Sequence, residues 1–131
     1  MATATPVLPP APIAATLYAR LGGEESIVQI VDVTINLVAT NPKTARSFDK
    51  VNLANVKKKI VEHLCALADG PCKYTGDAMH LVHRGMDITE GEFYGMVEAL
   101  RFALDRAHVN EAAKNELLRI LAPMKRDIVT K

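Results

Sequence analysis

The chain has 131 residues, 49% of them hydrophobic and 24% charged, and its formal net charge is +1. These values are typical of one globular domain and exclude a disordered chain, and the near-neutral charge gives no reason to expect nucleic acid as a partner. Proline interrupts the most apolar stretch and no apolar run reaches the roughly 18 residues of a transmembrane helix, so no membrane span is predicted.

The start of the chain is rich in proline and alanine. Four of the seven prolines lie in the first twelve residues, which is typical of an extended leader rather than of a packed element. This stretch has neither the basic region nor the continuous apolar region of an intact secretory signal. We expect residues 1–15 to form a flexible leader and residues 16–131 to form the folded domain.

Two long helices are predicted in the first half of the domain. Apolar residues recur three and four positions apart from Glu24 to Ala39, which predicts an amphipathic helix that ends at Asn41-Pro42. A second helix is predicted to begin at Asn52, a favourable N-cap, and to end at Asp69-Gly70-Pro71.

Three further helices are predicted along the rest of the chain. A short one covers about residues 77–84. Thr89 and Glu92 have the spacing of a capping box at the start of the next helix. The last helix begins near Asn110, and Pro123 is its expected kink. Because no alternating strand pattern of useful length occurs, the predicted fold class is all-α.

Cys65 and Cys72 flank a Gly70-Pro71 turn, with six residues between them. A bridge across this short loop would contribute roughly 2.5 kcal/mol, if the geometry permits it. Two reduced, unrelated thiols are the alternative, because the redox compartment is unknown.

The ionisable residues alone do not identify a site. His80 and His83 are three positions apart and could share a metal, but no carboxylate or cysteine stands at a matching ligand spacing nearby. The sequence shows neither a Ser-His-Asp grouping nor a glycine-rich phosphate loop. Taken singly, each histidine is more typical of an ordinary core or surface residue. Lys57 and Lys58 are expected on a solvated helix face.

Several short sequence segments follow one another along the chain. Each is a weak family signal alone, but the ordered series is a specific one. They are LYARLGGEESI from Leu17, then Phe48, DGPCKYTG at residues 69–76, MHLVHRGMDITEGEF at residues 79–93, and LAPMKRDIV at residues 121–129. This ordered series resembles the group I truncated hemoglobins, from Leu17 to about Val129. The resemblance implies an all-α, two-over-two helical sandwich around heme b.

By resemblance, His83 occupies the histidine of the family's His-x-Gly segment and is the expected proximal ligand of the heme iron. A neutral imidazole is a suitable iron ligand, and a short helix lets it stand perpendicular to a porphyrin plane. Tyr74 and Arg84 are candidates for contact with a propionate. The other expected pocket residues, which would otherwise be ordinary core, are Phe48, Met79, Met86, Ile88, Phe93, Met96 and Val97.

This sequence departs from the family pattern at residues expected on the side of the heme opposite His83. Many group I members hold oxygen with a tyrosine and glutamines, whereas the aligned residues here are Ile35, Val56 and Ile60. Loss of a charge-assisted hydrogen bond, worth about 1.5–3 kcal/mol, predicts shorter oxygen residence. Lys59 and His63 are candidate sixth ligands, and an open or water-bound iron is the alternative. Lys59 would first have to lose its proton, at roughly 4.6 kcal/mol at pH 7.

The sequence therefore predicts a heme protein that reversibly binds oxygen, nitric oxide or carbon monoxide, rather than a dedicated enzyme. Three alternatives remain: electron transfer with His63 or Lys59 as sixth ligand, nitric oxide dioxygenation or peroxide chemistry, and a helical interaction domain that has lost heme. The expected partners are the gas and a redox partner or reductase, and the chain is expected to be a monomer. Because related chains with this paired-cysteine turn look exported, a periplasmic location is expected, with the cytoplasm as the alternative.

Overall fold

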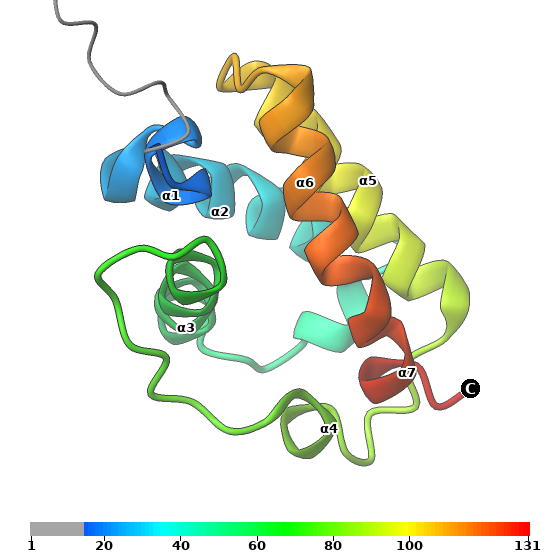
Figure 1. Ribbon diagram of the computed structural model, residues 1–131. Coiled ribbons are helices and arrows are strands. Elements are labelled where there is room, and N and C mark those ends of the chain that lie inside the picture. Colours follow the sequence, from blue (N-terminus) through cyan, green and yellow to red (C-terminus); the bar gives the residue numbers. More distant parts are fainter. Residues whose placement is uncertain (1–14) are drawn as a thin grey trace, which may run out of the picture.

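The computed structural model describes residues 15–131, so the predicted leader lies outside the described residues apart from Ala15. In the described part, every regular element is helical (Figure 1). The elements are α1 (Leu17–Arg20), α2 (Gly23–Thr40), the 3-10 helix η2 (Ala45–Phe48), α3 (Leu53–Leu67), α4 (Met79–Val82), α5 (Glu90–Arg106), α6 (Glu111–Leu121), the 3-10 helix η3 (Ala122–Met124) and α7 (Lys125–Ile128).

Helix α2 is the element on which the other helices pack. It makes the most extensive helix contacts of the fold, with α5 and α3, and α6 lies beside α5 (Figure 1). Two helix pairs, α2 with α3 and α5 with α6, therefore enclose the interior. Burial of each large aliphatic side chain there contributes roughly 1.5–3 kcal/mol. The buried core includes Ile27, Ile30, Val31, Ile35, Val38, Leu64, Leu100, Leu104 and Leu117.

The predicted long helices are confirmed, with small shifts at their ends. The side chain of Asn52 accepts a hydrogen bond from the amide of Asn55 at 3.1 Å. Thr89 and Glu92 form the expected capping box, and Asn110 caps α6. These side chains satisfy amides that a helix leaves unpaired in its first turn. Within residues 15–131, none of the helices combines the length and the apolar character that a membrane crossing requires.

The predicted short helix over residues 77–84 is wrong in extent, because α4 contains only Met79–Val82. Ala78 at its N-cap provides no side-chain hydrogen bond, and Gly85 adopts a positive φ of 78° that ends the following turn. His83 is therefore the C-cap residue of a single helical turn. Its ring is positioned by a local contact with this turn rather than by a long helix.

Of the two lysines of α3 predicted on a solvated face, Lys58 is exposed and Lys57 is partly buried. The amine of Lys57 donates hydrogen bonds to Asp32 at 2.7 Å and to Asn36 at 2.8 Å. Both partners lie on α2. Lys57 therefore connects the two helices of one pair at their solvent edge.

Glu92 is a buried carboxylate that joins three segments of the chain. It accepts hydrogen bonds from Arg46 at 2.6 Å, from Ser47 at 3.2 Å and from the amide of Thr89 at 2.9 Å. Arg46 also donates to the carbonyl oxygens of Met86 and of the residue after it, at 3.0 and 2.7 Å. This cluster fixes η2 against the loop that leads into α5.

Burial raises the pKa of the Glu92 carboxyl, but the hydrogen bonds from Thr89 and Arg46 outweigh burial and leave the pKa below its usual value. The ionised form of Glu92 is therefore stabilised in the folded protein.

Cys65 and Cys72 form a disulfide, with 5.7 Å between their Cα atoms. Of the two alternatives that the sequence leaves open, the structure has the bridge. Cys65 is fully buried near the end of α3, so the bridge attaches the following loop to the core.

We expect Glu92→Gln to lower the free energy of unfolding by about 1–2 kcal/mol at pH 7, because it removes the charge that Arg46 and Thr89 stabilise. A lowered folded-state pKa gives stability that is present above the unfolded value of about 4.3 and is lost as pH falls through the folded value. Urea unfolding at pH 7 and at acid pH should therefore show the difference between the two proteins shrinking in acid. A difference independent of pH would contradict this role.

For the disulfide, we expect one intramolecular bridge by mass spectrometry, with two alkylated thiols appearing only after reduction. Cys72→Ala should lower the free energy of unfolding by about 2.5 kcal/mol, because the unfolded chain is no longer constrained. Reductant should then change the stability of the native protein but not that of the variant. Two thiols that alkylate without reductant would refute the bridge.

Candidate functional site

A cavity of about 400 Å³ lies between the two helix pairs. Its walls come from α2, η2, α3, the segment around α4, α5 and the C-terminal helices. Arg84 is the one sequence-predicted site residue that does not line it, and its side chain is exposed. The predicted residues that do line it are Ile35, Phe48, Val56, Lys59, Ile60, His63, Tyr74, Met79, His83, Met86, Ile88, Phe93, Met96 and Val97.

His83 lies in the wall formed by the α4 segment, and its side chain is partly buried. Its Nδ1 lies 2.8 Å from the carbonyl oxygen of Met79. Because a carbonyl oxygen can only accept a hydrogen bond, this contact places a proton on Nδ1, and in the neutral ring the lone pair is then on Nε2. His80, three residues earlier, is exposed and does not line the cavity.

The wall formed by α2 and α3 is mainly hydrocarbon. Ile35 is fully buried, and Val56 and Ile60 are partly buried beside it. The hydroxyls of Thr34 and Thr44 donate to backbone carbonyl oxygens at 2.7 and 2.6 Å. The hydrogens of these two hydroxyls are thus used within the protein.

Lys59 and His63 line the cavity but contact the loop after α3. The amine of Lys59 donates to the hydroxyl of Thr75 at 2.6 Å and lies 3.9 Å from the carboxylate of Glu62. The ring of His63 stacks on that of Tyr74, with 4.5 Å between centroids and 21° between planes. Burial lowers the pKa of His63, which favours its neutral form.

Tyr74 has a second contact that bears on its predicted role. Its hydroxyl donates to the carbonyl oxygen of Asp77 at 2.6 Å. Burial, together with the nearby charges of Asp77 and Glu62, raises the pKa of Tyr74 and keeps the phenol protonated. The ring of Tyr74 therefore stacks on His63, and its hydroxyl is hydrogen-bonded to the backbone.

Glu92 and Ser47 also line the cavity, although the sequence motifs do not identify them as site residues. The capping-box spacing marks Glu92 only as the start of a helix. Its pairing with Arg46 depends on a separation of 46 residues and has no local signal. Leu121, Met124 and Ile128 complete the wall from the C-terminal end.

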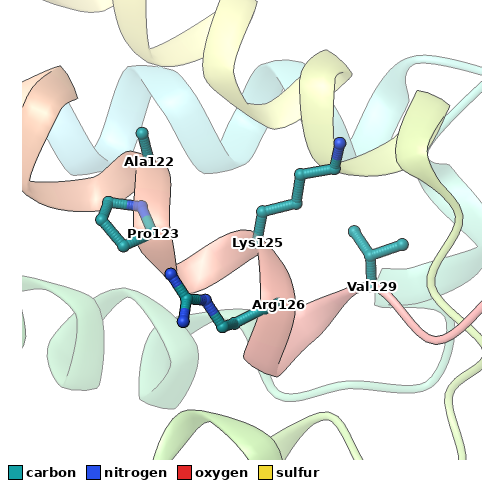
Figure 2. Close-up of a pocket in the computed structure, with 5 residues that line it drawn as sticks. All are labelled: Ala122, Pro123, Lys125, Arg126 and Val129. Carbon is teal, nitrogen blue, oxygen red and sulfur yellow. The ribbon is translucent and has the colours of Figure 1, made fainter.

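A second, open depression of about 360 Å³ lies over the C-terminal turn, next to Ala122, Pro123 and Arg126 (Figure 2). The amine of Lys125 at its edge donates to Glu90 at 2.7 Å and to the hydroxyl of Tyr94 at 3.0 Å. Residues 15–131 also contain no cluster of three or more side chains suited to a metal ion. The cavity that His83 lines is therefore the candidate site.

Comparisons with known proteins agree on the family. The family model described as bacterial-like globin matches residues 16–130. The group 1 truncated hemoglobin of Mycolicibacterium paratuberculosis is 33% identical over 116 residues, which cover 88% of this chain and 85% of the relative. The crystal structure of the Fe(III) form of truncated hemoglobin from Tetrahymena pyriformis matches with a TM-score of 0.84 and 26% identity, over 88% of this chain and 99% of that one.

The fold alone is also similar to the 2/2 hemoglobin of Synechococcus sp., with a TM-score of 0.82 and 20% identity, over 89% of this chain and 100% of that one. The predicted all-α, two-over-two architecture is thus confirmed. The chain belongs to the bacterial-like globin family, among the group 1 truncated hemoglobins.

Proposed function

We propose that this truncated hemoglobin holds heme b in the cavity, with His83 as the proximal ligand, and reversibly binds a diatomic gas. Membership of the globin family makes the chain a heme protein with a gas-binding role. The observation that carries the finer proposal is that His83 lines the apolar cavity while its Nδ1 contacts the carbonyl oxygen of Met79, which in the neutral ring leaves Nε2 to bind a metal. Hydrogen bonding of the other ring nitrogen is the usual way in which a protein orients an imidazole ligand.

The residues present fit heme. A cavity of about 400 Å³ is in the size range of small-molecule sites, and its walls are largely aliphatic and aromatic. Phe48 and Phe93 supply aromatic faces, while Met79 and Met86 supply flexible apolar side chains that adapt to a flat ligand. When bound, the heme iron supplies the site for the diatomic ligand.

The wall opposite His83 is proposed to control how long the gas stays bound. Ile35, Val56 and Ile60 have hydrocarbon side chains, which offer no hydrogen bond to a polarised ligand. Carbon monoxide needs less polar assistance than oxygen. This wall therefore favours carbon monoxide over oxygen, relative to relatives with polar residues there.

Electron transfer is the second candidate function, and it depends on His63 as a sixth ligand. The lowered pKa of His63 favours the neutral ring that a metal requires. Its stack on Tyr74 competes with that role.

We expect His83→Ala to abolish stoichiometric heme binding or to leave heme loosely held, because the coordinating nitrogen is lost. His80→Ala is the matched control and should retain heme, since His80 is exposed and outside the cavity. Heme content and the absorption spectra of both variants in the ferric and ferrous states test this. A His83→Ala protein with a native spectrum would overturn the assignment.

Ile35→Tyr should slow oxygen release by roughly 10- to 150-fold, since a hydrogen bond to bound oxygen is worth about 1.5–3 kcal/mol. Ile35→Phe is the control. It adds nearly the same volume without the hydroxyl, so it separates the effect of the hydrogen bond on oxygen release from the effect of crowding. Stopped-flow oxygen release from the native protein and both variants gives the comparison. Slow native release, unchanged by the tyrosine, would refute an apolar distal wall.

A further inference from the structure

The loop that leaves α3 passes beside that helix before it reaches α4 (Figure 1). Its residues 72–75, the strap, are attached to α3 at several points. The disulfide joins Cys72 to Cys65. The amide and the hydroxyl of Thr75 both donate to Glu62, at 3.1 and 2.7 Å.

The strap also contacts both candidate sixth ligands. The ring of Tyr74 covers a face of His63, and the hydroxyl of Thr75 accepts the hydrogen bond from Lys59. Lys59 and His63 are the nitrogen-bearing cavity residues on α3. The same short segment therefore contacts both side chains.

The disulfide is the covalent attachment of the strap to α3. The other attachments are one ring stack and hydrogen bonds among partly exposed side chains, with the Lys59 and Glu62 side chains 35% and 20% exposed. Contacts of this kind are individually weak in water. The disulfide shortens the chain segment that must become ordered before the ring stack and the hydrogen bonds can form together.

We propose that the Cys65–Cys72 disulfide is a redox switch that controls the sixth position of the iron. In the bridged form the strap holds His63 against Tyr74. In the reduced form the strap loosens and His63 is free to bind the iron. His63 rather than Lys59 is the expected ligand, because a lysine must first lose a proton. This inference rests on the proposed heme site.

The switching step is a thiol–disulfide exchange. A dithiol reductant transfers two electrons and two protons to the bridge, the S–S bond breaks, and Cys65 and Cys72 become thiols while the reductant becomes a disulfide. The reverse exchange closes the strap again. Gas binding to the reduced form then has to wait for His63 to leave the iron.

Hydrogen exchange at the backbone amide of Thr75 tests the mechanical step. We expect exchange at least tenfold faster in the dithiol-treated, heme-loaded protein than in the bridged protein, because the hydrogen bond to Glu62 opens. Reoxidation should restore slow exchange. Equal exchange in the two forms would overturn the switch. This measurement does not depend on the iron, so a failure of the heme proposal would be distinguishable from a failure of the strap.

Spectra and carbon monoxide kinetics test the ligand. Cys72→Ala is a permanently open strap, and it should show a second nitrogen ligand in its absorption spectrum and bind carbon monoxide at least tenfold more slowly than the bridged protein. Treatment with a dithiol should convert the native protein to this behaviour and leave the variant unchanged.

Double variants identify which side chain is the second nitrogen ligand. Adding His63→Ala to Cys72→Ala should restore fast carbon monoxide binding and remove the second nitrogen ligand, whereas adding Lys59→Ala should not. A Cys72→Ala protein with native spectrum and kinetics would overturn the proposal, as would recovery with Lys59→Ala alone. If Cys72→Ala does not fold, the native protein before and after dithiol treatment provides the same comparison.

Discussion

The structure depends on burial of the apolar face of α2. This face packs on α3 and α5 at once, and its residues Val31, Ile35 and Val38 belong both to the core and to the wall of the cavity. Since close-packed interiors transmit small changes in volume, the shape of the cavity is coupled to the packing that stabilises the fold. A substitution such as Ile35→Tyr therefore acts on the cavity and on the core together.

The part of the cavity wall that contains α4 and His83 is held in place in a different way. Helix α4 is a single turn, too short to be stable by its own hydrogen bonds. Polar attachments on either side compensate for this. The Arg46–Glu92 pair holds the loop after His83, and the disulfide with the Thr75 hydrogen bonds to Glu62 holds the loop before it. The α4 segment is thus the part of the cavity wall that loop contacts hold in place, whereas α2, α3 and α5 hold their parts by helix packing.

The chemistry follows from which polar groups remain available. The hydroxyls of Thr34 and Tyr74 and the carboxylate of Glu92 are used in internal hydrogen bonds. One ring nitrogen of His83, Nδ1, contacts the carbonyl oxygen of Met79, and the proposed function assigns the other to the iron. The part of the wall formed by Ile35, Val56 and Ile60 is hydrocarbon. Under the proposed function, retention of the gas would depend on this apolar packing and on the freedom of the neighbouring His63 side chain.

The sequence by itself determined the long helices, their caps and the family, because helical periodicity and capping act over a few residues and the motifs occur in order. Of the site residues that it named through the resemblance, all but the exposed Arg84 line the cavity, but about half of the residues that line the cavity, among them Ser47 and Glu92, were not named. Only the tertiary structure paired Lys57 with Asp32, Glu92 with Arg46 and the ring of His63 with Tyr74. These contacts join residues 11 to 46 positions apart, and such pairings exist only once the packing of α2 has brought the helices and loops together.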